Sequence, residues 1–144
     1  MASIHSKRSA DWGQLVAPDG ALLETLALEA LARFPQDILE QLGSIQMVVA
    51  EYPEDQLLNS LGLEDPSELL GVFETNIFTA EAIRAANIPA YNRFWLFRRP
   101  ILDHWAAHGE PLGMVVSNLL VQELGYSLDL SEEALERMDA AVEE

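Results

Sequence analysis

Cysteine is absent from the 144 residues of this chain. This absence excludes disulfide bonds and any zinc site built from thiolates, and it agrees with a reducing compartment, so we expect a cytoplasmic location. Long apolar runs are also missing, since none approaches the roughly 20 residues that a membrane-spanning helix needs. The first residues lack the apolar core of a secretory signal peptide. We therefore expect no association with a membrane.

Basic residues are scarce. Eight lysines and arginines stand against 24 aspartates and glutamates, which gives a formal net charge of −16. Proteins bind nucleic acids chiefly through lysine and arginine, so this balance argues against a nucleic-acid partner. Acidic residues become denser in residues 121–144, where Arg137 is the one basic residue. We interpret this charge as a solvated surface that aids solubility, and the binding of a basic partner is the alternative.

The composition predicts one globular domain. Hydrophobic residues make up 49% of the chain, which is enough for a compact core. Residues 1–17 show no periodicity and are expected to form a mobile leader. The domain is therefore placed at residues 18–144.

Apolar residues at helical spacing predict a series of helices. Asp19 and Ser131 are suited to cap the first and the last of them, and glycines at 62 and 109 to end two others. The predicted helices cover residues 20–34, 53–61, 80–86, 100–108 and 132–142, together with a longest helix that runs from Pro111 through Leu124.

Three segments are predicted to be strands. Alternating apolar residues indicate a strand at 45–51, and residues 69–73 indicate a second. The run FWLF at 94–97 has apolar residues on both faces, which is typical of a central strand covered on both sides. The chain is therefore expected to have an α+β fold with a small sheet of about three strands packed against several helices.

Two short patterns place polar or potentially metal-binding side chains four residues apart. The longest predicted helix contains NLLVQELGY at 118–126, in which Gln122 and Tyr126 flank Glu123 and Gly125. An earlier helix contains HWAAH, with two histidines at 104 and 108. Phosphate-binding loops and nucleophile elbows are missing from the sequence.

The sequence contains, in this order, the strand LLGVFE, the segment WLFRRPILDHWAAH and the helix with QELGY. In this order of segments the chain resembles the small bacterial zincin-like metallopeptidase family. The resemblance covers residues 20–142 and implies a minimal zincin-like fold. It places Gln122 and Tyr126 where that family has the two zinc-binding histidines of its HExxH motif. Glu123 then matches the catalytic glutamate, and Glu132 matches an acidic position that can supply a third ligand.

Zinc chemistry needs the two imidazoles that this motif lacks. Histidines at i and i+4 share one ion, which lowers the pKa of a bound water to about 7, and the glutamate then removes its proton. A glutamine amide and a phenol are poor zinc ligands. We therefore expect no cofactor and a vestigial role for Glu123, with Gln122 and Tyr126 hydrogen-bonded inside a closed former cleft. Burial would raise the pKa of Glu123, and a tyrosine hydroxyl donated to it would lower that pKa.

These features favour a catalytically inactive member of the family that acts as a peptide-binding, protein-binding or regulatory module. Its partner is expected at a sheet edge beside the helix, as in strand addition. The alternative is an active metallopeptidase with an atypical zinc site that uses Glu123 and Glu132, with a contribution from His104 or His108. The histidine pair is otherwise interpreted as surface or half-buried side chains, with His108 favoured by the helix dipole.

Overall fold

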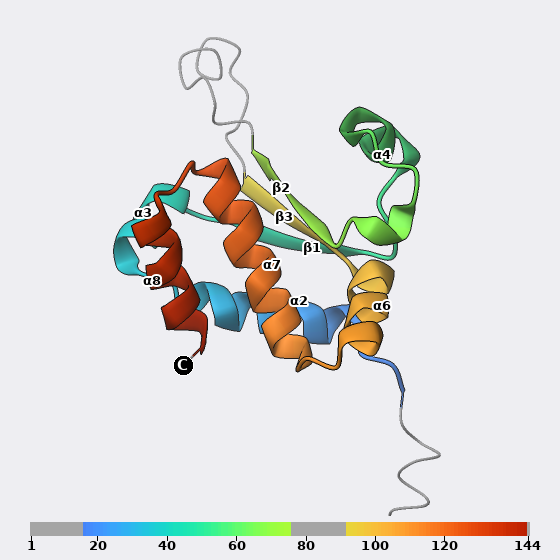
Figure 1. Ribbon diagram of the computed structural model, residues 1–144, viewed down its shortest axis with the longest axis horizontal. Coiled ribbons are helices and arrows are strands. Elements are labelled where there is room, and N and C mark those ends of the chain that lie inside the picture. Colours follow the sequence, from blue (N-terminus) through green and yellow to red (C-terminus); the bar gives the residue numbers. More distant parts are fainter. Residues whose placement is uncertain (1–15, 76–91, 144) are drawn as a thin grey trace, which may run out of the picture.

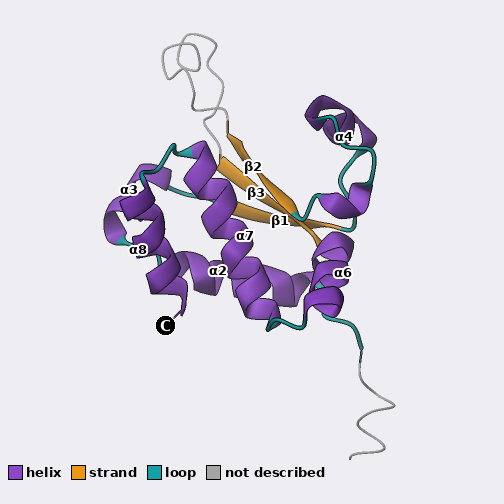
Figure 2. Cartoon of the chain, in the orientation of Figure 1, coloured by secondary structure: helices purple, strands orange, loops and turns teal. Residues whose placement is uncertain are grey.

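The computed structural model describes residues 16–75 and 92–143. Helices gather mainly on one side of a small sheet (Figures 1 and 2), which confirms the predicted α+β architecture. The elements are α2 (Gly20–Ala32), α3 (Gln36–Leu42), β1 (Gln46–Ala50), α4 (Asp55–Leu61), the 3-10 helix η1 (Pro66–Glu68), β2 (Gly71–Thr75), β3 (Asn92–Phe97), α6 (Arg98–His108), α7 (Leu112–Ser127) and α8 (Glu132–Glu143). The predicted helix at 80–86 and all but the last two residues of the predicted leader lie outside the described residues.

The sheet has the strand order β1-β3-β2, so the FWLF segment occupies the predicted central position. β3 is parallel to β1 and antiparallel to β2. The long stretch of chain between β1 and β3 connects the parallel pair. The other edge of β2 pairs with no strand among the described residues.

The two faces of the sheet differ in how well they are covered. Phe94 and Leu96 of β3 are fully buried and belong to the main core beneath α2 and α7. Trp95 points to the opposite face because side chains alternate along a strand. It is half-buried and lies outside the main core. The prediction that both faces are covered is therefore wrong for this position: an apolar run indicates burial, but only packing determines what lies over each face.

Most helix ends follow the capping residues that the sequence indicated. The Asp19 carboxylate accepts the Leu22 N–H at 2.9 Å, and the Ser131 hydroxyl accepts the Ala134 N–H at 3.2 Å. α4 and α6 begin at Asp55 and Arg98, whereas the sequence predicts starts at Pro53 and Pro100.

Helix α3 was missed by the sequence prediction. The first helix is predicted to run to residue 34, but α2 ends at Ala32, and Pro35 is the N-terminal cap of α3. Ile38 and Leu42, four residues apart, are both buried in the main core. Their spacing is the signal that could have revealed this short helix.

One buried polar residue ties the sheet to α3. The Asn92 side chain donates to the Leu42 carbonyl and accepts from the Thr75 hydroxyl, each at 2.6 Å. These bonds join the start of β3 to the end of β2 and to the end of α3. No helix within residues 16–75 and 92–143 is both long and apolar enough to cross a membrane.

Candidate functional site

Among the described helices, α7 has the most buried residues, and it carries the candidate site. It packs against α2, β2, α6 and α8. Its inward face carries eight buried residues, among which Leu120 and Leu124 have no exposed surface. The buried residues are Val115, Val116, Ser117, Leu119, Leu120, Val121, Leu124 and Gly125. This packing fixes the direction of the QELGY side chains that lie between the buried positions.

Gln122 and Tyr126 lie on the outward side of α7. Tyr126 is 88% exposed and Gln122 is also exposed. The expectation that both side chains are enclosed in a closed former cleft is therefore wrong. The sequence placed them correctly on one helical face, but whether another element covers that face depends on where α8 packs.

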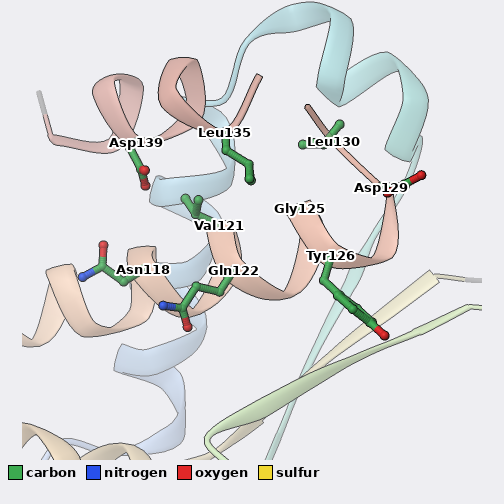
Figure 3. A pocket seen from close by; sticks show the side chains of 9 residues that line it. All are labelled: Asn118, Val121, Gln122, Gly125, Tyr126, Asp129, Leu130, Leu135 and Asp139. Atoms are coloured by element: carbon green, nitrogen blue, oxygen red, sulfur yellow. The ribbon is translucent and has the colours of Figure 1, made fainter. Parts of the chain in front are cut away.

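A hollow of about 520 Å³ lies between α7 and α8 beside these residues (Figure 3). Amides of Asn118 and Gln122 and carboxylates of Asp129 and Asp139 line it, together with apolar side chains. In Figure 3, Leu135 points from α8 toward α7, whereas Tyr126 extends away from α8 toward the strands. The polar groups are thus spread around an open hollow and do not converge on one point.

Gly125 has a packing role at this contact. A Cβ atom added at Gly125 would overlap with the Cδ2 atom of Leu135. The missing side chain therefore lets α8 approach α7 closely, and Leu135 occupies the space. The glycine of QELGY is therefore explained by helix packing, without any requirement for a metal.

The residues present do not fit a zinc ion at the motif. Neither Gln122 nor Tyr126 carries an imidazole, and the described part of the chain contains no group of three or more His, Asp or Glu side chains placed to hold a metal. Glu132 is exposed at the first position of α8, and it forms no such group with Glu123.

The histidine pair lies on another helix, α6. The His104 and His108 rings stack with their centroids 4.0 Å apart. Nδ1 of His108 lies 2.9 Å from the His104 carbonyl oxygen, and Nε2 of His104 lies 3.8 Å from a Glu110 carboxylate oxygen. Both rings therefore make their contacts within α6 and the turn that follows it. Among the described residues the two histidines do not form a metal-binding group with Glu123 and Glu132.

Burial raises the pKa of the half-buried Glu123 carboxyl group above its ordinary value. Of the two opposing effects considered from the sequence, burial is the one that operates, because Tyr126 projects into solvent. The folded state therefore holds the Glu123 proton to a higher pH than the unfolded state does.

This raised pKa predicts a pH-dependent effect of Glu123→Gln. Because the folded state binds more protons than the unfolded state, stability falls as the pH rises from the ordinary pKa of glutamate through the raised one. At pH 7 the variant is therefore expected to be more stable than the wild type, and the difference disappears below the ordinary pKa. Urea unfolding at a series of pH values measures this, with the exposed Glu136→Gln as control. Equal stability of Glu123→Gln and wild type at pH 7 would contradict it.

Asp129 adopts a left-handed backbone conformation, which is uncommon for a residue other than glycine. Its φ is 51°, and it follows the end of α7. The Leu130 N–H donates to the Gly125 carbonyl at 3.0 Å, and the Asp129 N–H donates to the Tyr126 carbonyl at 3.2 Å. This pair of bonds is the Schellman motif, whose left-handed residue is usually glycine.

We expect Asp129→Gly to stabilise the protein by about 0.5–1 kcal/mol, because glycine adopts positive φ without steric cost. Chemical denaturation measures the change. Asp139→Gly is the matched control, since the same substitution inside α8 is expected to cost about 1 kcal/mol. A loss of stability in both variants would show that the conformation at Asp129 is not strained.

Comparison with known proteins adds family information to this geometry. No curated protein shows significant sequence similarity to the chain. A model of the zincin-like metallopeptidase family, in contrast, matches residues 42–142, which include the whole sheet, α7 and nearly all of α8. Because the match covers most of the chain, this protein belongs to the zincin-like metallopeptidase family.

Proposed function

We propose that this protein is a catalytically inactive zincin-like metallopeptidase that binds a peptide or protein without cleaving it. The observation that carries the proposal is the side-chain chemistry on α7. If QELGY is aligned with the HExxH motif, as its spacing suggests, Gln122 and Tyr126 fall at the positions of the two zinc-binding histidines. Both are exposed, and neither belongs to a set of metal-binding side chains among the described residues.

The remaining glutamate does not replace this chemistry. Zinc supplies the nucleophile by lowering the pKa of bound water to about 7. Glu123 alone can hold or release a proton, and its pKa is raised by burial. A carboxylate of this kind does not lower the pKa of water as a metal does, so the water remains protonated and is a weak nucleophile. The alternative zinc site that includes Glu123 and Glu132 has no support in the placement of these residues.

The free edge of β2 is the proposed place for the partner. Among the described residues β2 pairs with β3 only, and α7 packs beside it. An extended peptide can add to such an edge through main-chain hydrogen bonds, with side chains turned alternately to the two sides. Within the described residues this edge is unpaired, which supports the binding of a peptide there.

The test uses untagged protein that has been treated with a chelator and then equilibrated with zinc. Metal analysis, cleavage of a mixed peptide library followed by mass spectrometry, and amide NMR shifts with the same library are measured in parallel. We expect no stoichiometric zinc, no zinc-dependent cleavage, and shifts along β2. One tightly bound zinc per chain that is lost in Glu123→Ala, or zinc-dependent cleavage, would overturn the inactive assignment. Absence of any shift along β2 would overturn the binding site.

A further inference from the structure

The sheet carries a second hollow on the face turned away from the main core. It has a volume of about 450 Å³ and lies between the strands and the segment that includes α4. Figure 1 shows α4 standing apart from the other helices. Apolar side chains dominate the lining: Ala50, Tyr52, Leu57, Val72, Trp95 and Phe97.

The register of the strands shows that this face is continuous. Trp95 is paired with Val48 on one side and with Val72 on the other, and Phe97 is paired with Ala50. Paired residues point to the same face of a sheet. None of these five side chains belongs to the main core or packs against it. They form a separate apolar surface across all three strands.

Part of this surface is open to solvent. Val48, Val72 and Trp95 are half-buried, and Tyr52 at its border is 45% exposed. Leu61 at the end of α4 is 49% exposed. Single exposed apolar residues are ordinary, but apolar residues around one hollow indicate a binding surface.

The segment beside this hollow is acidic. The segment 51–68, which contains α4, has six carboxylates and no lysine or arginine. Glu54 and Glu74 line the hollow itself. Two nearby arginines are engaged with acidic groups, since Arg93 lies 3.4 Å from Glu74 and Arg98 lies 3.1 Å from Glu51. Arg99 adjoins the same region, where its backbone N–H donates to the Glu51 carbonyl. A ligand for this surface has to complement an apolar floor and an acidic border.

We propose that the open face of the sheet docks a basic segment of a partner protein, which inserts a large apolar side chain over Trp95 and Val72 and places lysine or arginine beside Glu54. A second copy of this chain does not meet this requirement, because two surfaces of a protein with net charge −16 repel each other. The site differs from the β2 edge proposed above, since it recognises side chains on the sheet face and requires no main-chain pairing.

Three short synthetic peptides of equal length test the proposal: alternating Lys and Leu, alternating Glu and Leu, and alternating Lys and Ser. Val72→Lys places a positive charge in the hollow. Leu28→Lys is the matched control, because it makes the same charge change at a 45% exposed residue of α2. Circular dichroism verifies that both variants are folded, and fluorescence anisotropy and amide NMR measure binding.

We expect the Lys–Leu peptide to bind the wild type best, to shift the Trp95 and Val72 signals, and to bind Val72→Lys about tenfold more weakly than Leu28→Lys.

Equal binding of the Lys–Ser peptide would show attraction by charge alone and overturn the proposal. Equal binding of the Glu–Leu peptide, equal weakening by both variants, or no binding by the Lys–Leu peptide would overturn it as well. Shifts confined to the β2 edge and α7 would support the proposed function and reject this second site. Dimerisation that Val72→Lys abolishes would assign the face to a second copy and also reject it.

Discussion

Replacing Gln122 and Tyr126 together with histidine is expected to create a zinc site on the surface of α7. The two positions lie four residues apart on one helix, and both are exposed, so the new imidazoles are accessible and close enough to share an ion. Zinc bound only by the folded state stabilises it by about 2.7 kcal/mol when free zinc is about 100 times the dissociation constant. For a chain of this size the expected rise in Tm is roughly 5–10 °C.

Thermal unfolding with and without zinc, together with titration calorimetry, measures this effect. The wild type is expected to show no zinc-dependent shift. The matched control is Gln122→His with Ser127→His, which introduces the same number of imidazoles at a spacing of five, where they diverge around the helix. If the pair at 122 and 126 binds zinc no better than this control, the alignment of QELGY with the family motif is wrong. Peptide hydrolysis is not expected to return, because partners that orient the ligands are also needed.

Substitution of Gly71 by alanine is expected to lower the free energy of unfolding by about 3 kcal/mol. Gly71 is buried at the start of β2, where β2 pairs with the central strand. An added Cβ atom would lie 2.6 Å from the Trp95 carbonyl oxygen and 2.9 Å from the Cδ2 atom of Leu119. The carbonyl oxygen belongs to the backbone of β3 and cannot move away without displacing the sheet. Since Leu119 belongs to α7, the substitution also disturbs the packing of the sheet against α7.

Gly113→Ala provides the control for this prediction. Gly113 lies in the first turn of α7, and the nearest side-chain atom to an added Cβ is Cδ2 of Leu26 at 3.8 Å. This distance is ordinary contact, so the higher helix propensity of alanine is expected to stabilise the protein by up to about 1 kcal/mol. Urea unfolding of both variants measures the difference. A Gly71→Ala protein as stable as the wild type would mean that β2 and β3 are less closely packed than the structure shows.

Local sequence signals were sufficient for much of the fold. Asp19 and Ser131 predicted the starts of α2 and α8, since a capping side chain acts on backbone groups within a few residues. The FWLF run predicted the central strand, and β3 does lie between β1 and β2, although the main core covers only one of its two faces. α3 escaped prediction because only three residues separate it from α2, and its cap, Pro35, makes no side-chain hydrogen bond that marks a helix start.

The candidate site was predictable in its chemistry but not in its environment. The positions of Gln122, Glu123 and Tyr126 on one helix follow from their spacing. Their exposure does not, because α8 could have covered Tyr126 and instead leaves it 88% exposed. The contact of Leu135 with Gly125 joins two helices across the turn at Asp129, and no local signal indicates which leucine of α8 fills that space.

The sequence by itself determined that the motif helix has no imidazole at positions 122 and 126, because the chemical identity of a side chain does not depend on folding. It also determined the α+β order and the excess of carboxylates. Only the tertiary structure decided that burial raises the pKa of Glu123 and that the Trp95 face of the sheet is left partly open. Both properties depend on which distant segments pack over a residue, and this is set by the sum of many weak contacts across the whole domain.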